Sequence, residues 1–182
     1  YRYMIKNASL ENKNVLITGG AGFIGSELTK QVLSHGANVS VVDNLVNGKK
    51  SNLNLDDKNL MFYEEDIRNQ QVMQNLISKS DYVFNLACLG VRHSIHSPIE
   101  SHSVNADATL NLLKMSRETD IKKFVHISTS EVYGTAKYVP MTEEHPTAPH
   151  TVYGASKLAG EAYARAYSCL LYTSDAADDW SS

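Results

Sequence analysis

The glycine-rich segment at residues 15–25 constrains the fold more than any other part of the 182-residue chain. It reads VLITGGAGFIG: an apolar run typical of a buried strand, glycines spaced G-x-x-G-x-x-G, and then helix-forming residues. A strand, a tight glycine turn and a helix together bind the pyrophosphate of a dinucleotide at a helix N-terminus. Glycine turns also follow strands for purely steric reasons, so the segment alone favours dinucleotide binding without establishing it.

A second apolar segment ends in an acidic residue where a dinucleotide-binding unit needs one. It spans residues 38–43 and ends at Asp43, 24 positions after Gly19. A carboxylate at this place accepts hydrogen bonds from the adenosine ribose and repels a 2′-phosphate, so we expect NAD rather than NADP as the cofactor. Lys49 and Lys50 could bind a phosphate, but we interpret them as solvated loop residues.

Strand and helix patterns alternate along the rest of the chain, which predicts an α/β fold with a doubly wound parallel sheet. The expected strands lie at residues 14–18, 38–43, 59–64, 81–87 and 123–128. The expected helices lie at residues 23–35 and 69–79, from 98 onward and from 151 onward. Residues 1–13 are expected to be a poorly ordered lead-in, and residues 88–97 a loop.

The predicted fold also places the polar residues that follow its strands. Ligands of such sheets bind beyond the carboxyl ends of the strands, where the sequence has Gly19, Asp43, Asp66, Ala87 and Thr129. For the helix that starts at Pro98, a residue favoured at the first helical position, the expected buried residues are Ile99, Leu110, Leu112 and Leu113.

The composition excludes several classes of protein. Hydrophobic residues make up 42% of the chain and the formal net charge is -3, so there is no electrostatic reason to bind nucleic acid or an anionic membrane. No apolar run approaches the roughly 18 residues that span a bilayer, and no signal-peptide pattern is found. The two cysteines, Cys88 and Cys169, do not have metal-binding spacing. We therefore expect a cytoplasmic protein with no nucleic acid or membrane partner.

Tyr153 and Lys157 have the spacing of a proton-transfer pair, because residues four positions apart share one face of a helix. A phenol has a pKa of about 10, and a neighbouring ammonium together with a cationic nicotinamide is expected to lower it. Tyr153 would then take a proton from a substrate alcohol, and Thr129 would hydrogen-bond the same oxygen. An isolated Y-x-x-x-K is usually a half-buried tyrosine beside a surface lysine, but here it follows a dinucleotide fingerprint.

The segments GGAGFIG, DNLVNG, DI, NLA, STSEVYG and YGASKLAGE occur in an order that resembles the extended short-chain dehydrogenase/reductase family. The nucleotide-sugar epimerase/dehydratase branch is the most similar, and the resemblance covers residues 14–168, interpreted as a partial Rossmann-type NAD-binding domain. It implies cofactor contacts from Gly19, Gly22, Phe23, Ile24, Gly25, Asp43, Asn44, Asp66, Ile67, Leu86, Ala87, Asn105, Tyr153 and Lys157. It also implies a catalytic set of Thr129, Tyr153 and Lys157, with Glu131 as a further acid or base.

The resemblance implies an NAD-dependent enzyme that oxidises C4 of a nucleotide-diphosphate sugar to a 4-keto intermediate. Glu131 decides the fate of this ketone, since 4-epimerases usually have a small or neutral residue there, whereas 4,6-dehydratases use a glutamate to remove the C5 proton. Nucleotide-sugar decarboxylases, of the kind that act on UDP-glucuronate, have a similar T-S-E pattern. Glu131 could also be a solvated carboxylate, and a non-catalytic NAD-binding protein is a further alternative.

Two further expectations concern metals and the end of the sequence. His93, His96 and His102 have no carboxylate or cysteine to complete a ligand set, so we expect no metal site. Residues 169–182 resemble a translated sequencing adapter, and we interpret them as a non-native tail. The sixth strand and the C-terminal substrate domain that the resemblance implies are missing, so we expect an inactive fragment whose full-length parent is a homodimer.

Overall fold

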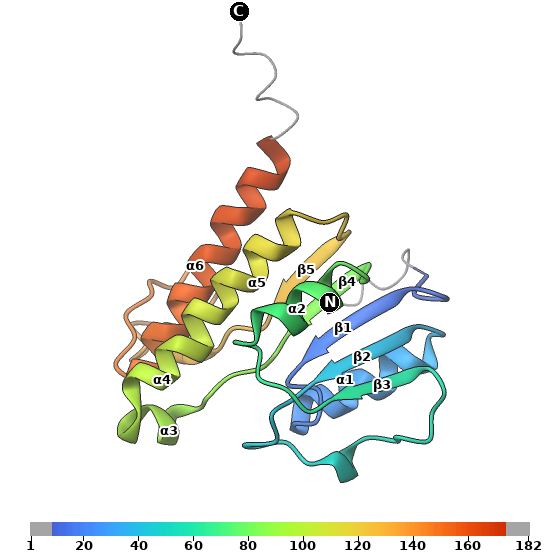
Figure 1. Cartoon of the computed structure of the whole chain (residues 1–182). Helices are drawn as coiled ribbons and strands as arrows, with labels where there is room; N and C mark the ends of the chain where they lie inside the picture. The colour runs from blue at the N-terminus through green and yellow to red at the C-terminus, as the bar shows by residue number, and fades with distance from the viewer. Residues whose placement is uncertain (1–8, 174–182) are drawn as a thin grey trace, which may run out of the picture. The chain divides into compact units, whose positions relative to one another are not determined.

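Five short apolar segments form one sheet with strand order β3-β2-β1-β4-β5. The structure is a computed structural model that describes the backbone of residues 9–173 and the side chains of residues 9–168 (Figure 1). The strands are β1 (Asn14–Thr18), β2 (Asn38–Val42), β3 (Leu60–Tyr63), β4 (Tyr82–Asn85) and β5 (Lys123–His126). β1 pairs in parallel with β2 and β4, and β2 pairs in parallel with β3. The predicted doubly wound α/β fold is confirmed.

Six α-helices connect or follow these strands in the described residues. They are α1 (Phe23–Ser34), α2 (Gln70–Ile77), α3 (Val91–His96), α4 (Pro98–His102), α5 (Ala108–Arg117) and α6 (Val152–Thr173). Two 3-10 turns, η1 (Lys50–Asn52) and η3 (Ser130–Val132), and a π-helical turn, η2 (Ser103–Asp107), complete the described helical elements. None of the described helices is long and apolar enough to span a membrane.

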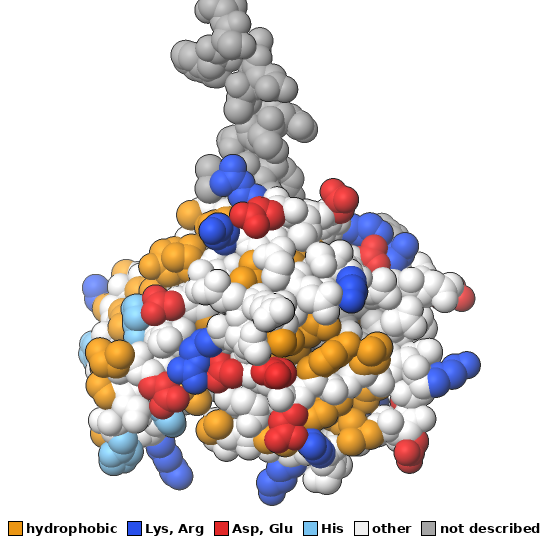
Figure 2. All heavy atoms as spheres, viewed as in Figure 1, with side chains coloured by type: hydrophobic (Ala, Val, Ile, Leu, Met, Phe, Trp, Pro, Cys, Tyr) orange, Lys and Arg blue, Asp and Glu red, His pale blue; other side chains and the backbone are white. Residues whose placement is uncertain are grey.

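The chain folds as two compact units. The first contains the described residues up to Ala87 together with Thr119–Val125, and the second contains Cys88–Glu118 and the described residues from His126 onward. On the face drawn in Figure 2, acidic and basic side chains are interspersed, which suits the small net charge of -3.

The core of the first unit is built on β1, which is buried from Val15 to Thr18 as expected for a strand in the middle of a parallel sheet. Side chains of β1, β2 and β3 form one apolar cluster with Val32 of α1, and Leu28 and Leu33 pack against it. These three residues therefore make up the face of α1 that packs on the sheet. The cluster attaches α1 to the sheet and so fixes the direction in which the helix leaves the glycine turn.

The lead-in to β1 is more ordered than the sequence suggested. Of the residues expected to be poorly ordered, 1–8 lie outside the described residues, whereas Leu10 packs against the core of the first unit. Asn12 has a positive φ of 56° and donates its backbone N–H to Gly36 O at 2.8 Å. One apolar residue in a polar segment was enough to anchor it.

In the second unit, α5 and α6 lie side by side (Figure 1). Helical structure starts at Pro98 as expected, but the burial of Ile99 was predicted wrongly, because its side chain is 83% exposed. The π-helical turn η2 explains the error, since it has more residues per turn than an α-helix and rotates the preceding residues out of phase with Leu112 and Leu113, which are buried. Residues 91–96, expected in a loop, form the short helix α3.

Residues Cys169–Thr173 of the expected non-native tail continue α6, and residues 174–182 lie outside the described residues. The origin of the tail therefore stays a prediction about the sequence.

We expect Gly25→Ala to destabilise the chain although alanine normally favours a helix. A Cβ at residue 25 would lie 2.1 Å from the carbonyl oxygen of Gly19, so the glycine turn or α1 would have to move. We expect the free energy of unfolding to fall by about 2 kcal/mol or more, measured by thermal or urea denaturation. Gly90→Ala is the matched control, because nothing lies within 4 Å of its Cβ position. Equal stability of the two variants would contradict the prediction.

Candidate functional site

The glycine turn of the first unit has the backbone geometry that a pyrophosphate cradle needs. Gly19 has a positive φ of 70°, and a Cβ there would lie 2.8 Å from the backbone nitrogen of Ala87, so only glycine fits. Gly22 is the N-cap of α1 and has no side chain to accept hydrogen bonds from the first turn of the helix. Phe23 and Ile24 in that turn are 93% and 65% exposed. The residues present therefore fit an anion bound at the N-terminus of α1.

Asp43 is attached to this turn by its carboxylate. One carboxylate oxygen accepts a hydrogen bond from the backbone of Ala21 at 3.0 Å, and the other accepts one from Leu45 at 2.9 Å. Gly48 passes so close that a Cβ there would lie 2.7 Å from the same carboxylate. Each oxygen has a second lone pair, so Asp43 can still accept hydrogen bonds from ribose hydroxyls. The sequence predicted that Asp43 binds the ribose, but it contained no sign that Asp43 also holds the glycine turn.

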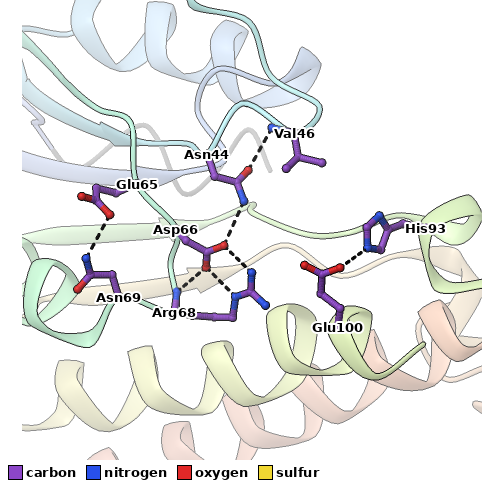
Figure 3. A network of polar contacts seen from close by, with 8 residues as sticks. All are labelled: Asn44, Val46, Glu65, Asp66, Arg68, Asn69, His93 and Glu100. Atoms are coloured by element: carbon purple, nitrogen blue, oxygen red, sulfur yellow. Dashed lines mark hydrogen bonds and ion pairs between the residues drawn. The ribbon is translucent and has the colours of Figure 1, made fainter. Parts of the chain in front are cut away.

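Asp66 lies in a polar network with Asn44 and Arg68 (Figure 3). Arg68 donates to both carboxylate oxygens of Asp66, at 2.9 and 2.8 Å, and Asn44 donates to one of them at 3.2 Å. The hydrogen bonds from the Arg68 side chain are the main cause that holds the pKa of Asp66 below its usual value. Arg68 was missed by the sequence reasoning, and Ile67 between them is buried.

Leu86 and Ala87 follow β4 at the point where the strand order reverses, and ligands of open α/β sheets bind at such points. The buried hydroxyl of Thr18 accepts a hydrogen bond from the backbone of Ala87 at 3.2 Å and donates one to Asn85 at 2.7 Å. The backbone of Leu86 donates to Thr18 O at 3.2 Å. Thr18 and Asn85 therefore fix the end of β4 beside the glycine turn, a contribution that the sequence did not reveal.

In the second unit, Tyr153 and Lys157 lie one turn apart near the start of α6. Thr151 caps this helix, since its hydroxyl accepts a hydrogen bond from the backbone of Gly154 at 2.9 Å. Tyr153 is half-buried, whereas Lys157 is only 2% exposed and donates its ammonium proton to the carbonyl oxygen of Ile127. The expected shared face of Tyr153 and Lys157 is thus present in the structure.

The predicted lowering of the Tyr153 pKa includes a cationic nicotinamide and stays a prediction, because in the chain without cofactor the pKa of this phenol is raised. Burial raises the pKa of the phenol, and Cys88 and Glu131 raise it further, whereas a hydrogen bond with Thr129 lowers it. The prediction relied on the neighbouring ammonium of Lys157 together with the nicotinamide charge. The ammonium contacts Ile127 O, and burial also lowers the pKa of Lys157.

Thr129 and Glu131 lie in the turn that follows β5. The Thr129 hydroxyl accepts a hydrogen bond from the backbone of Glu131 at 3.3 Å and so caps η3. The exposed Glu131 carboxylate accepts a hydrogen bond from Thr151 at 3.4 Å. Thr129, Glu131, Tyr153 and Lys157 are therefore brought together within one unit.

Asn105 is buried in η2, where its amide group connects three segments of the second unit. Its side chain donates to Leu89 O at 2.9 Å and Ser156 Oγ at 3.0 Å, and accepts from the backbone of Leu89 at 2.8 Å. The resemblance placed Asn105 among cofactor contacts. The structure gives it a supporting position, because it attaches the segment after β4 to the helix that carries Tyr153 and Lys157.

Two of the three histidines considered as metal ligands lie beside acidic side chains. His93 pairs with Glu100 at 2.8 Å (Figure 3), and His102 lies 3.6 Å from Asp107. No group of three or more histidine, cysteine or acidic residues that could bind a metal is found among the described residues.

Comparison with known proteins identifies the family. A family model described as GDP-mannose 4,6 dehydratase matches residues 16–172. The chain belongs to this family. The resemblance to the epimerase/dehydratase branch of the extended short-chain dehydrogenases, inferred from the motifs, is thereby confirmed.

Individual members of the family are similar over most of this chain. UDP-glucose 4-epimerase of Halalkalibacterium halodurans is 37% identical over 176 residues, which are 91% of this chain and 52% of the relative. UDP-N-acetylglucosamine 4-epimerase of Methanobrevibacter ruminantium M1, solved with UDP-N-acetylmuramic acid, has a TM-score of 0.81 and 34% identity, covering 86% of this chain and 51% of that one. The dTDP-glucose 4,6-dehydratase DesIV of Streptomyces venezuelae, solved with NAD, has a TM-score of 0.80 and 34% identity, covering 85% and 51%.

The chain spans about half the length of the relatives that it matches.

His126 generates a prediction about stability at acidic pH. Burial, reinforced by the charge of Lys157, lowers the pKa of this imidazole from 6.5 to about 3. The unfolded chain therefore binds a proton that the folded chain rejects, and stability is lost as the pH falls from 6.5 towards 3, by up to about 1.4 kcal/mol per pH unit.

We expect His126→Gln to flatten the pH dependence of the thermal midpoint between pH 7 and pH 4, even if the variant is less stable at pH 7. Replacement of the exposed His96 by glutamine is the control and should leave the slope unchanged. A slope in His126→Gln as steep as in the parent chain would refute the assignment.

Proposed function

We propose that this chain is part of an NAD-dependent nucleotide-sugar epimerase/dehydratase that oxidises C4 of the sugar to a 4-keto intermediate. The observation that carries the proposal is the cluster of Thr129, Tyr153 and Lys157, in which a half-buried phenol that interacts with a threonine lies on the same helix as a buried lysine, one turn away. Binding alone does not need such a phenol, so the cluster argues against a non-catalytic NAD-binding protein. The family membership and the solved relative with NAD support the same proposal.

In the first unit, the proposed cofactor residues are those that fit an anion and a ribose. The backbone at Gly19, Gly22 and Gly25 and the exposed first turn of α1 would receive the pyrophosphate. Asp43 would accept the ribose hydroxyls, and its charge favours NAD over NADP. Further proposed contacts of the first unit are Phe23, Ile24, Asn44, Asp66, Ile67, Leu86 and Ala87, and those of the second unit are Asn105, Tyr153 and Lys157.

In the second unit, Tyr153 is the proposed base for the 4-hydroxyl of the sugar. Bound NAD⁺ would supply a hydride acceptor and a positive charge. Because burial and Glu131 raise the pKa of Tyr153, the phenol keeps its proton until positive charge is added near it. With the cofactor bound, Lys157 would stabilise the phenolate, and Thr129, whose side chain interacts with the phenol, would orient the substrate oxygen.

Glu131 is the proposed acid or base for the step after oxidation. Its exposed carboxylate is oriented by Thr151, the cap of the helix that carries Tyr153. This arrangement suits removal of the C5 proton in a 4,6-dehydratase, while a 4-epimerase has no use for it. A uronic acid decarboxylase would release carbon dioxide from the same 4-keto stage.

Two finer parts of the proposal concern the whole protein. We propose a homodimer and a cytoplasmic location, the latter because the sequence has no disulfide or metal pattern of cysteines. Sedimentation of the full-length protein tests the dimer, and a monomer at micromolar concentration would argue against it.

We expect Tyr153→Phe in the full-length protein to reduce turnover of UDP-glucose or dTDP-glucose by at least about 100-fold, because it removes the proton acceptor. NAD binding, measured by calorimetry, should change by less than about threefold, since the aromatic ring is kept. Tyr163→Phe on the same helix is the control and should leave both unchanged. Wild-type turnover in Tyr153→Phe would overturn the proposed function.

We expect Glu131→Gln to separate the possible outcomes. In a dehydratase, C4 oxidation should persist and reduced cofactor should accumulate, while formation of the 6-deoxy product falls by about 100-fold or more. In an epimerase the variant should keep nearly full activity. The products are identified by NMR, and Glu143→Gln in an exposed loop serves as the control.

A further inference from the structure

Residues 126–128, which are the last residue of β5 and the two that follow it, contact α6. Lys157 donates its ammonium proton to Ile127 O, and the hydroxyl of Ser128 donates to the carboxylate of Glu161 at 2.8 Å. On the other side, the missing side chain of Gly160 lets α6 approach His126, since a Cβ there would lie 3.1 Å from the imidazole Nε2. The segment 126–128 thus contacts α6 at Lys157, Gly160 and Glu161.

Glu161 is the residue in this arrangement to which neither the family resemblance nor the proposed mechanism gives a role. It follows Lys157 by four residues, so both side chains lie on the same face of α6. Its side chain is 20% exposed and has an inner partner, Ser128, and an outer partner, Arg165. Arg165 is 70% exposed, so its charge is largely solvated, whereas the hydrogen bond from Ser128 fixes the inner carboxylate oxygen towards the end of β5.

We propose that Glu161 is a positioning residue that acts through Lys157: Ser128 holds the carboxylate of Glu161, which follows Lys157 by one turn of α6, and this negative charge keeps Lys157 protonated. The proposal rests on the proposed function only in that Lys157 is taken to serve Tyr153. The coupling between Glu161 and Lys157 is a property of the folded chain and exists whether or not a sugar is turned over.

The physical need for such a group comes from burial. Lys157 as a whole is 2% exposed, so its ammonium has lost most of its hydration, which favours release of the proton. Ile127 O offers the ammonium a dipole but no net charge. Burial lowers the pKa of Lys157, and Cys88 and Glu161 are the groups that raise it again. Cys88 has the larger effect of the two, and Glu161 is the one that is a carboxylate.

The other ionisable groups around α6 do not replace this carboxylate. His126 at the end of β5 is kept neutral by the same burial, and its pKa is about 3. Glu131 of η3 acts on Tyr153 rather than on Lys157. On the helices that pack against α6, acidic side chains pair with histidines: Glu100 of α4 with His93 of α3, and Asp107 of η2 with His102 of α4.

A simpler role for Glu161 predicts a different result. If Glu161 only attaches α6 to Ser128 and forms an i,i+4 pair with Arg165, its replacement changes stability but leaves the titration of Lys157 where it was. The proton affinity of Lys157 therefore discriminates between a positioning role and a merely structural one.

The experiment is an NMR titration of this chain labelled with carbon-13 in its lysine side chains. The Lys157 Cε signal, assigned by through-bond correlation to its backbone, is followed over about pH 5.5 to 11, the range in which buried and exposed lysines titrate. We expect the midpoint of Lys157 to fall by about one pH unit or more in Glu161→Gln, a tenfold loss of proton affinity. Glutamine can still accept the Ser128 hydrogen bond, so the variant removes charge with little change of shape.

Two further variants keep the proposal falsifiable. Ser128→Ala leaves the charge but releases the carboxylate, and we expect a smaller fall of the Lys157 midpoint. Arg165→Gln removes the exposed partner of Glu161 and is the matched control, in which the midpoint should not fall. An unchanged Lys157 midpoint in Glu161→Gln, or in Ser128→Ala if the first variant does not fold, overturns the proposal.

The activity of the full-length protein gives a separate readout. If the proposed function is right, Glu161→Gln should shift the pH profile of C4 oxidation in the same direction as the Lys157 midpoint. If Tyr153→Phe proves fully active, the proposed function fails while the NMR titration still decides the coupling of Glu161 to Lys157.

Discussion

Close backbone approach at the glycine turn is the constraint on which the first unit depends. A Cβ at Gly19 would meet the backbone of Ala87, and a Cβ at Gly25 would meet the carbonyl of Gly19, so strand ends and helix can lie together only where these side chains are absent. The same approach brings Ala21 within hydrogen-bond distance of Asp43. One steric condition therefore sets three things: the exit of α1, the position of the carboxylate after β2, and the junction of β1 with β4.

In the first unit, glycines allow the site segments to pack closely. In the second unit, hydrogen bonds of buried polar side chains fix the positions of the site segments. Asn105 lies in the π-helical turn η2, and its side chain makes hydrogen bonds to the segment after β4 and to α6. Buried amides that are fully hydrogen-bonded define one arrangement, because any shift would leave a polar group without its partner. Tyr153 and Lys157 lie on the helix that Asn105 helps to place. The precision of the proposed catalytic cluster thus comes from residues that do not take part in the chemistry.

The fold and the identity of the main candidate residues could be predicted because they depend on local patterns. The glycine spacing, the acid after β2 and the four-residue separation of Tyr153 and Lys157 are all visible in the sequence. The features that could not be predicted depend on contacts between distant segments. The exposure of Ile99 results from a π-helical turn, which has no sequence signature that we could recognise. The role of Arg68 results from its fork-like pairing with Asp66, and the direction of the Tyr153 pKa results from burial.

The pKa of Tyr153 is raised and that of Lys157 is lowered, and these two shifts define the state of the candidate site before a ligand binds. Burial makes the charged form of each group less favourable, so the phenol keeps its proton and the ammonium is held only with help from nearby negative charge. A carboxylate close to the phenol would oppose its ionisation, and Glu131 acts in that sense. The carboxylate of Glu161, which Ser128 holds, favours the ammonium of Lys157. Glu131 therefore opposes ionisation of Tyr153, whereas Glu161 favours the charged form of Lys157. At rest the phenol keeps its proton and the lysine keeps its positive charge.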